Sequence, residues 1–593
     1  MSGSGYEVVP LEDFQSVFGG TFTEISSEAL NSHVVSVSDE FFAAASQLLE
    51  VGPALSLKGQ FGPNGALYSG WETRRHNTAH DWCIIKLGVP SGYIIGFDID
   101  TSNFNGNEAP AASVGGFFAG AGSTPPKWDD QWDELLPRVK LGPNSRHLFK
   151  IPKTKRAYTH VKLSMYPDGG IARFRVYGVV SPIFPGDRSA TIDLAHVYSG
   201  GCVVSVSDQH FGIGPNLLLP GRGKDMSDGW ETKRSRLPDH NDSAIIRLGA
   251  SGFLEQVEID TANFVGNFPE SCEVHALNSP DVSIFPPDLP IPSHADPAWS
   301  LILPRTNLGP NRRHFFQLDG QLDCPYTHVK VTIYPDGGIK RVRVIGRRSF
   351  DDLASENILG SVEGEEIKAL PKLPVLSEDT VDSSRFTRPS IFPAVPLTRE
   401  AFARFGDVIQ AWANPNSAPK GIRVTSANQG TAFKFHKLSA ALSSYPSDAN
   451  AGPPGISVFR CTPPHNLPEG ARSFPVRILE RHPLTNQAFI PMGYGTIAGA
   501  EDDVLPEAGK AYLVIVALNG SDDKPDLKTL RAFIASTSQG VSYGVGIWHH
   551  PMIALEKPID FACVETQIGT PGSKLDCEVV DVQDGPLIHI PNF

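Results

Sequence analysis

Two short segments of the chain each place one carboxylate beside closely spaced cations. GWETRR begins at Gly70, and the related GWETKRSR begins at Gly229. Guanidinium groups bind planar carboxylates in a forked geometry, and carboxylates are the default general acids and bases. The segments therefore suit an anionic, hydrogen-bonding substrate, and a site at the interface of the two copies could use both sets. The candidate residues are Glu72, Arg74 and Arg75 in the first segment and Glu231, Arg234 and Arg236 in the second.

A second pair of segments carries asparagines close behind an aspartate. DIDTSNFNGN contains Asn103 and Asn107, and EIDTANFVGN contains Asp260, Asn263 and Asn267. An asparagine side chain offers both a donor and an acceptor, which matches the amide face of a small substrate. The same pattern is typical of turns, in which such side chains bond to nearby backbone and glycine supplies a permissive conformation. The sequence leaves both interpretations open.

In the C-terminal part, residues suited to catalysis or metal binding are concentrated in two segments, RILERHPLTNQAFIPMG and, later, GVGIWHHPMIAL. The first contains His482 and Gln487, and the second contains His549 and His550. Cupin barrels bring such separated ligands together in a central cavity, and neutral imidazoles bind divalent metals readily. Since neighbouring residues of a strand face opposite ways, only one of the two adjacent histidines should face the cavity. The tentative metal ligands are His482, Gln487 and His549.

The first two sets of segments belong to an internal repeat. VVSVSDEFF from Val34 returns as VVSVSDQHF from Val203, LGPNSRH returns as LGPNRRH, and YPDGG occurs at Tyr166 and at Tyr334. The order of the motifs is kept at an offset of about 160 to 170 residues, which is typical of a duplicated structural unit. We expect one repeat in residues 1–185 and the other in residues 186–349.

Runs within each repeat alternate with a period of two residues. Val161, Leu163 and Met165 alternate with Lys162 and Ser164, as expected of half-buried antiparallel strands. The fold class that we predict is mainly β, with two jelly-roll β-sandwiches of the galactose-binding type. YPDGG reads as a hairpin turn, and the tryptophans of the GWET segments read as core anchors.

The repeat motifs do not return in the last third of the chain. Residues 350–394 are acidic and irregular, as expected of a linker. A helix is predicted over TREAFARFGDVI, with Thr398 as its cap and Gly406 as its end. The strand-like runs GISVFRC, YLVIVAL, RAFIA and IDFACVET follow, and they predict a cupin-like β-barrel in residues 395–593.

The overall composition limits the classes of partner. A net charge of −14 and a sequence pI near 5.7 argue against nucleic acid and anionic membranes, whose binding needs clustered cations. Seven cysteines without a C-x-x-C pair favour a reducing compartment, and neither a signal peptide nor a membrane-length apolar run is evident. We expect a cytoplasmic protein.

The motifs of the first 350 residues resemble those of the allantoicase family. GWETRR, GWETKRSR, DTxNFxGN, LGPNxRH and YPDGG occur in the family's order. The resemblance implies hydrolysis of allantoate to ureidoglycolate and urea, which needs a cation for the carboxylate, an acid for departing urea and a base for water. Our candidates are Arg75, Arg234 and Arg236 for the cation and Glu72, Glu231, Asp242 and Asp260 for the acid and base. One copy could catalyse while the other supports it, because Arg236, His240 and Asn241 have no clean equivalents in the first copy.

Residues 395–582 resemble the ureidoglycolate lyase family through the two histidine-containing segments, DKPDLKTLRAFIA and DFACVET. The resemblance implies cleavage of ureidoglycolate to glyoxylate and urea on a cupin-like barrel, a dimeric assembly and a divalent metal. No organic cofactor is needed for such a cleavage, in which Glu480, His482 and His549 are the candidate acid–base groups. The positions that match the family's motifs as substrate contacts are Arg481, Gln487 and His550 and, in SANQGTAFKFH, Asn428, Gln429, Lys434 and His436.

Two rival functions remain. The repeats could be paired carbohydrate-binding modules fused to a cupin enzyme, since the jelly-roll architecture permits that. Clusters of arginine and glutamate in place of a row of exposed aromatic residues argue against it. Alternatively, one half could serve only as an oligomerisation scaffold.

Overall fold

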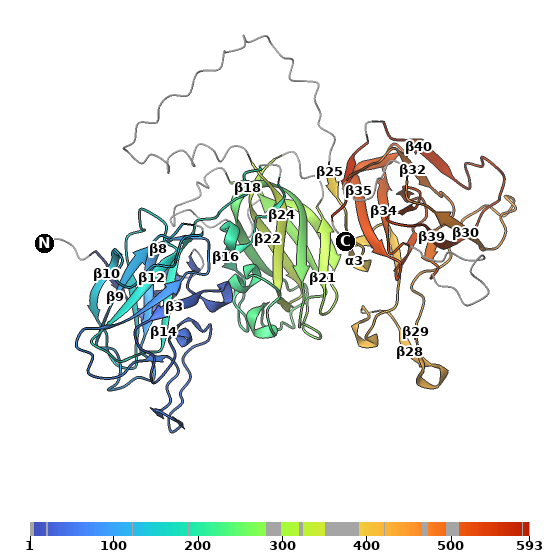
Figure 1. Ribbon diagram of the computed structural model, residues 1–593. Coiled ribbons are helices and arrows are strands. Elements are labelled where there is room, and N and C mark those ends of the chain that lie inside the picture. The colour runs from blue at the N-terminus through green and yellow to red at the C-terminus, as the bar shows by residue number, and fades with distance from the viewer. Residues whose placement is uncertain are drawn as a thin grey trace, which may run out of the picture. The chain divides into compact units, whose positions relative to one another are not determined.

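The regular elements of the computed structural model are mostly β-strands (Figure 1). The structure describes residues 5–18, 22–120, 122–187, 190–279, 298–318, 324–349, 391–419, 421–464, 473–493, 509–583 and 585–591. The prediction of a mainly β protein is confirmed. Most of the predicted linker, residues 350–390, lies outside the described residues.

The first repeat contains two five-stranded antiparallel sheets, as the alternating pattern predicts. Val161, Leu163 and Met165 of β12 are fully buried, as predicted, but Ser164 on the other face is buried as well. The strand order of one sheet is β1 (Glu7–Val9), β11 (Arg146–Lys150), β8 (Gly92–Asp100), β14 (Arg173–Val180) and β2 (Thr23–Glu24). That of the other is β10 (Asp133–Lys140), β9 (Ala111–Phe117), β12 (His160–Tyr166), β7 (Asp81–Lys86) and β3 (His33–Val37).

The second repeat follows the same plan with one difference. Its strand β18 (Asp242–Asp260) runs without interruption through the positions that form the separate strands β7 and β8 in the first repeat, so its strands join one sheet. The strands on the path of that sheet are β15 (Ile192–Asp193), β24 (Arg341–Arg348), β18, β22 (Tyr326–Tyr334), β19 (Ser271–Leu277) and β20 (Ser300–Asn307). Strands β16 (Cys202–Val206) and β21 (Arg313–Gln317) also pair with β18.

The YPDGG segments are not hairpin turns, and that prediction is wrong. In the first repeat the segment leaves β12, which pairs with β7 and β9, and enters β13 (Gly170–Ile171), which pairs instead with β6 (Trp71–Glu72). The second repeat repeats this arrangement with β17 (Trp230–Glu231) and β23 (Gly338–Ile339). The segment thus brings the chain back against the GWET strand.

One short α-helix, a two-stranded ribbon and six 3-10 turns complete the described elements of the repeats. Trp71 and Trp230 are fully buried, which confirms their role as core anchors. The remaining elements are α1 (Phe14–Val17), β4 (Phe61–Gly62), β5 (Gly65–Ala66), and the 3-10 turns η1 (Leu11–Asp13), η2 (Glu28–Leu30), η3 (Ala45–Leu49), η4 (Val197–Ser199), η5 (Gly214–Leu218) and η6 (Met226–Asp228).

The third domain is a barrel-like arrangement with a core on each side of its central strand β34 (Ala511–Asn519). Tyr512, Val514 and Val516 face one hydrophobic cluster, and Leu513 and Ile515 face the other. This explains why YLVIVAL is a continuous apolar run, because a strand covered on both faces needs no polar side. The domain is cupin-like, as predicted.

The strands of the third domain form two larger sheets and two smaller ones. The first has the order β26 (Val395–Pro396), β35 (Pro525–Ser536), β34, β37 (Trp548–His549), β32 (Ile478–Arg481) and β40 (Glu578–Asp581), and β38 (Ile553–Ala554) pairs with β34. The second has the order β27 (Gly406–Ile409), β36 (Gly540–Tyr543), β33 (Gln487–Pro491), β39 (Ile559–Glu565) and β30 (Gly455–Cys461). The smaller sheets contain β25 (Ile391–Pro393), β41 (Leu587–His589) and β31 (Ser473–Pro475), and β28 (Val424–Ala427) with β29 (Ala432–Phe435).

The helix predicted over residues 398–409 is much shorter in the structure. Thr398 caps it as expected, because its hydroxyl accepts a hydrogen bond from the backbone N–H of Ala401 at 3.2 Å. The helix α3 spans only Arg399–Phe402, and Gly406 begins strand β27 instead of ending a helix. Pairing of β27 with β36 and burial of Val408 outweigh the local helical preference. Two further 3-10 turns are η7 (Pro415–Ser417) and η8 (Asn428–Gly430).

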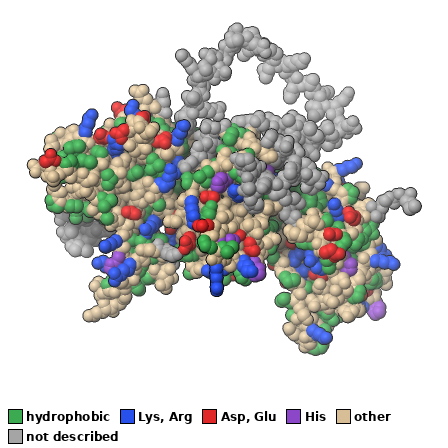
Figure 2. Space-filling model, turned by 180° about the vertical axis from the view of Figure 1, so that it is seen from behind, with side chains coloured by type: hydrophobic (Ala, Val, Ile, Leu, Met, Phe, Trp, Pro, Cys, Tyr) green, Lys and Arg blue, Asp and Glu red, His purple; other side chains and the backbone are tan. Residues whose placement is uncertain are grey.

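Acidic and basic side chains are interspersed over the face of the molecule in Figure 2. The described part of the chain has no helix of the length and apolar character that a bilayer crossing would need. All seven cysteines are free thiols.

The buried strand β7 offers a direct test of the sandwich. Ile84 is fully buried, whereas Ile183 is 76% exposed. We expect Ile84→Ala to lower the free energy of unfolding by about 2 to 5 kcal/mol, because it leaves a cavity. Ile183→Ala removes the same atoms and should change it by less than about 0.5 kcal/mol. Thermal or denaturant unfolding of both variants measures this, and equal effects would contradict the placement of β7 in the core.

Candidate functional site

Each repeat brings its GWET glutamate together with the last asparagine of its DTxNFxGN segment. Asn107 donates from Nδ2 to Oε1 of Glu72 at 3.0 Å, and Asn267 donates to Oε1 of Glu231 at 2.6 Å. Burial raises the pKa of Glu72, while the Asn107 hydrogen bond and the nearby Arg75 oppose that rise. The structure therefore joins two clusters that were predicted separately.

The other asparagine of each segment has a local structural role. Asn103 and Asn263 both adopt a φ of 68°, in the left-handed region that asparagine tolerates better than most residues. The Nδ2 of Asn103 donates to the carbonyl of Ala54 at 3.3 Å, and its backbone N–H donates to Oδ1 of Asn144 at 2.8 Å. The backbone of Asn103 thus has a turn conformation, whereas its side chain binds backbone 48 and 49 residues away in sequence and does not join Glu72.

Two aspartates hold the GWET loop of the first repeat in place through hydrogen bonds. Neither was among the candidate residues. Asp39 accepts hydrogen bonds from the backbone N–H groups of Phe41 and Arg74, at 3.2 and 2.9 Å, and Asp168 of YPDGG accepts one from Asn77 at 3.0 Å. Both aspartates lie in segments that recur in the second repeat, as VVSVSD and YPDGG, and this recurrence was the available signal.

The cations of the first repeat are engaged with these aspartates. Arg74 lies 2.6 Å from Asp39, and Arg75 lies 3.4 Å from Asp168. Both arginines were predicted as substrate contacts. In the structure, the positive charge of each arginine is partly balanced by an aspartate of the same repeat.

The same loop of the second repeat borders a cavity of about 450 Å³. Asp208 and Asp336 take the places of the first repeat's aspartates, accepting from the backbone N–H groups of Lys233 and Ser235, each at 2.8 Å. The predicted residues Arg234, Arg236 and Asp242 all line the cavity. The full lining is Asp208, Lys233, Arg234, Ser235, Arg236, Leu237, His240 and Asp242.

Asp260, predicted as an acid or base, forms an ion pair with Arg222. Arg222 donates to its two carboxylate oxygens from Nε at 2.7 Å and from Nη2 at 2.8 Å, and the backbone N–H of Ala262 adds a third bond at 2.9 Å. Asp260 is fully buried. The carboxylate therefore has a structural partner and does not join Glu231.

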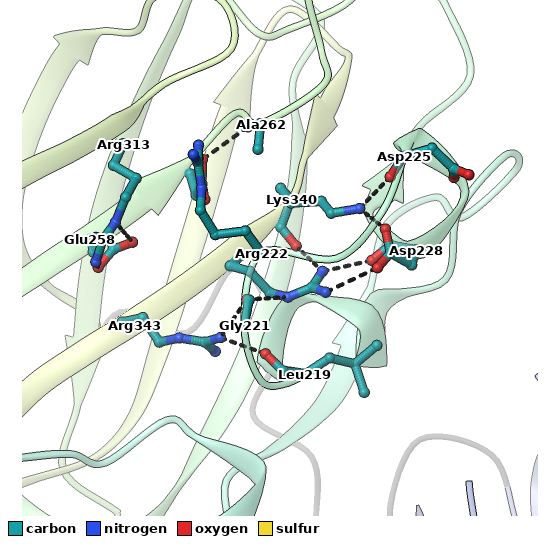
Figure 3. Close-up of polar contacts among 12 residues, drawn as sticks. Leu219, Gly221, Arg222, Asp225, Asp228, Glu258, Ala262, Arg313, Lys340 and Arg343 are labelled. Atoms are coloured by element: carbon teal, nitrogen blue, oxygen red, sulfur yellow. Dashed lines mark hydrogen bonds and ion pairs between the residues drawn. The ribbon is translucent and has the colours of Figure 1, made fainter. Parts of the chain in front are cut away.

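Figure 3 shows further charge pairs of the second repeat, Lys340 with Asp228 and Arg313 with Glu258. Lys340, which is fully buried, contacts Asp228 and the carbonyl of Asp225, and burial lowers its pKa to about 8. Arg313 binds Glu258 with two hydrogen bonds of 2.6 and 2.7 Å. In the first repeat Ala172 stands where Lys340 stands in the second.

The third domain brings Glu480, His482 and His549 together on β32, the residue after it, and the neighbouring strand β37. One ligand atom from each lies within 4.8 Å of the others. The Nδ1 of His482 lies 2.8 Å from the carbonyl of Asp576, and the Nδ1 of His549 lies 3.0 Å from that of Ile547. A carbonyl only accepts, so both rings carry a proton on Nδ1, and in its neutral form each ring presents a lone pair on Nε2. Both Nε2 atoms are buried without a hydrogen-bond partner among the described residues.

Gln487 and Glu565 complete this cluster. The Nε2 of Gln487 donates to Oε2 of Glu565 at 3.0 Å, and its Oε1 is buried without a partner in the described part of the chain. Glu565 was not selected from the sequence, although it lies two and four residues after Cys563 and Phe561, which point into the same core. The domain therefore presents two imidazole nitrogens, an amide oxygen and two carboxylates in one place.

Burial sets the electrostatics of the cluster. It raises the pKa of Glu480 to about 7, with the Glu565 carboxylate adding to the rise. It lowers the pKa of His549 to about 3, with His482 as a second cause. The ring of His549 also stacks on Tyr543 with 3.9 Å between centroids. His549 is therefore neutral at physiological pH, as a metal ligand must be.

Two predicted substrate contacts face away from the cluster. Arg481 neighbours Glu480 on β32 and so points to the opposite side, where it binds Asp523 at 2.7 Å and Glu578. His550 packs its ring against Phe474, as the expectation that only one of the adjacent histidines faces the cavity requires. Arg481 thus forms ion pairs outside the cluster, and His550 packs outside it.

The segment SANQGTAFKFH forms a hairpin of β28 and β29, which extends away from the barrel sheets in Figure 1. Asn428 and Lys434 border a hollow of about 540 Å³ beside it, and His436 hydrogen-bonds to Thr425 at 2.7 Å. Gln429 has a φ of 58° within the turn. Within the described residues, no hydrogen bond or ion pair joins these four side chains to the cluster around His482.

Comparison with known proteins finds two families along the chain. Residues 23–181 and 192–349 each match the family described as the allantoicase repeat, and residues 389–589 match the ureidoglycolate lyase family. The chain is 46% identical over 351 residues to the probable allantoicase of Schizosaccharomyces pombe, which covers 59% of this chain and 99% of that protein. It is 44% identical over 328 residues to the allantoicase of Saccharomyces cerevisiae, covering 54% of this chain and 93% of that one. The crystal structure of allantoicase from Saccharomyces cerevisiae superposes with a TM-score of 0.50 at 41% identity, covering 57% of this chain and 99% of that chain.

The ion pair of Asp260 predicts a measurable coupling. Arg222→Met should destabilise the second repeat by about 3 kcal/mol, because it leaves a buried carboxylate without its cation. Adding Asp260→Asn should recover part of that loss. Arg74→Met is the matched control, since this arginine is 67% exposed and its pair with Asp39 should contribute less than about 1 kcal/mol. Denaturant unfolding of these three variants and of Asp260→Asn alone tests this, and strictly additive effects of the two changes would contradict a coupled pair.

Proposed function

We propose that this chain, which belongs to the allantoicase family through residues 23–181 and 192–349 and carries a ureidoglycolate lyase domain at residues 389–589, catalyses two consecutive steps of ureide breakdown. The first is hydrolysis of allantoate to ureidoglycolate and urea. The second is cleavage of ureidoglycolate to glyoxylate and urea. The product of the first half is therefore the substrate of the second.

We assign the lyase site from the two oriented imidazoles of the third domain. Buried lone pairs on Nε2 of His482, Nε2 of His549 and Oε1 of Gln487 are costly unless something binds them. Nitrogen and amide oxygen donors suit a divalent transition metal. These three residues would hold it, and it would supply a Lewis acid for the hydroxy-carboxylate of the substrate.

The remaining groups of the cluster provide the proton transfers. Glu480 accepts the proton of the substrate hydroxyl, the carbon–oxygen double bond forms, and the carbon–nitrogen bond to urea breaks. The departing nitrogen takes up a proton, so that no net proton is gained or lost. Glu565 positions Gln487 through the 3.0 Å hydrogen bond between them. No covalent intermediate with the protein is needed.

The allantoicase half offers matched polar groups in its two repeats. Its cationic loops supply guanidinium groups for the substrate carboxylate, and the pairs Glu72–Asn107 and Glu231–Asn267 offer a carboxylate and an amide side by side. A carbohydrate-binding role is not favoured, because the matching family is an enzyme family and the loops carry charge in place of stacked aromatic rings. The dimeric assembly and the cytoplasmic location stay predictions.

The stoichiometry of the products tests both steps together. Supplied with allantoate, the full chain should release two molecules of urea for each glyoxylate. His482→Ala should stop glyoxylate release and leave one urea per allantoate, because only the second site is damaged. Coupled assays of urea and glyoxylate measure this. Release of glyoxylate by the variant at the wild-type rate would exclude His482 from the lyase site.

Metal binding by the third domain has a matched control in the adjacent histidines. His549→Ala removes an inward Nε2 and should weaken binding of Mn²⁺ or Zn²⁺ to the full chain by at least about tenfold. His550→Ala removes a ring that packs on Phe474 and should leave metal affinity unchanged. Titration calorimetry on the chelator-treated protein separates the two. Equal affinity of both variants would contradict metal ligation by His549.

A further inference from the structure

We propose that the second repeat carries the allantoate-cleaving site and that His240, held by Asp242, is its acid–base group. This inference rests on the proposed function. It goes beyond that function because neither the family match nor the conserved plan of the repeats says which copy reacts.

The loop between the GWET strand and the next long strand differs between the copies. It runs from Trp71 to Asp81 in the first repeat and from Trp230 to Asp242 in the second, where it is two residues longer. Its start is anchored alike in both copies, where Asp39 and Asp208 accept hydrogen bonds from the loop backbone. Its end is also anchored alike, where Asp81 and Asp242 each accept from a serine hydroxyl. The added length therefore goes into the segment that borders the cavity.

His240 belongs to this longer segment and forms a dyad with Asp242. Its Nε2 lies 3.2 Å from Oδ2 of Asp242, and its side chain is 26% exposed while that of Asp242 is 4% exposed. The other carboxylate oxygen of Asp242 accepts a hydrogen bond from the hydroxyl of Ser207 at 2.7 Å. A buried, fixed carboxylate thus orients an imidazole whose second nitrogen remains for proton exchange at the cavity.

The first repeat has the same carboxylate without the histidine. Asp81 is buried and accepts from the hydroxyl of Ser38 at 2.8 Å, as Asp242 does from Ser207. The nearest histidine in sequence, His80, stacks on Tyr166 with 5.0 Å between ring centroids, and no hydrogen bond joins it to Asp81. The serine–aspartate pair therefore occurs in both repeats, whereas the histidine–aspartate dyad occurs in the second repeat.

The cations beside the dyad are available to a ligand. Lys233, Arg234 and Arg236 line the cavity, and within the described residues no carboxylate lies within ion-pair distance of any of them. The one hydrogen bond of the Arg234 side chain goes to the carbonyl of Gly266 at 3.1 Å. In the first repeat Arg74 and Arg75 are instead paired with aspartates. An unpaired cationic rim beside an acid–base dyad fits a small carboxylate substrate.

The chemistry balances with one shuttling proton. Protonated His240 gives its proton to a ureido nitrogen of allantoate as the carbon–nitrogen bond breaks and urea departs. The lone pair of the second ureido nitrogen forms a carbon–nitrogen double bond to the same carbon. Water then adds to that carbon, and the proton it loses returns to His240. The sum is allantoate plus water to ureidoglycolate plus urea.

Paired substitutions in the two repeats test the assignment. We expect His240→Ala in the full chain to slow urea release from allantoate by about 100- to 10,000-fold, as for loss of a general acid–base group. His80→Ala should leave the rate within about twofold. Added imidazole should restore part of the activity of His240→Ala, which a merely misfolded loop would not allow. Asp242→Asn should shift the pH profile of urea release, whereas Asp81→Asn, which disturbs the equivalent serine–aspartate pair, should not.

The outcomes separate the inference from the function on which it rests. If the wild-type chain releases no urea from allantoate, the proposed function fails. If the wild type is active and His240→Ala is as active as His80→Ala, the inference is overturned while the function stands. Equal losses in the two histidine variants, or a loss that imidazole does not rescue, likewise count against a catalytic His240. Cleavage of supplied ureidoglycolate by the third domain should be unchanged in every variant.

Discussion

The N-terminal half depends on aspartate side chains that accept hydrogen bonds from the backbone of the GWET loop. An exposed loop of charged residues has little apolar surface to hold it, so its conformation must come from polar contacts. Asp39 and Asp168 provide them in the first repeat, and Asp208 and Asp336 do so in the second. Because the acceptors bind backbone N–H groups, the loop side chains can change without loss of these bonds. One scaffold can therefore present different charges to solvent in its two copies.

Much of the fold could be predicted from periodicity. The apolar positions of β12, the duplicated motifs and the apolar run of β34 each state which faces are covered, and the structure agrees with them. The predictions failed where pairing between strands far apart in the sequence determines the local structure. YPDGG has the composition of a hairpin but separates strands with different partners, and GDVI ends a helical pattern but pairs with β36. Neither partner is visible in a local window of sequence.

The candidate sites could also be predicted only in part, because contacts between residues far apart in the sequence determine which side chains meet. His482, His549 and Glu480 stand out by residue type, and they do meet. Arg481 and His550 stand out equally, but strand geometry turns each to the opposite face from its neighbour. The tautomers of the two inward histidines depend on carbonyls of Asp576 and Ile547, which no motif records. Asp260 was misjudged because its partner, Arg222, lies in a loop that differs between the repeats.

The two extra residues between Trp230 and Asp242 also bear on how a duplicated enzyme can diverge. Lengthening a loop whose ends are already fastened costs little conformational entropy, so such an insertion is nearly neutral for folding. One copy can then place new side chains over a cavity while the other copy keeps the shorter loop. Both copies therefore keep the same fold, while the chemistry of their loops can become different.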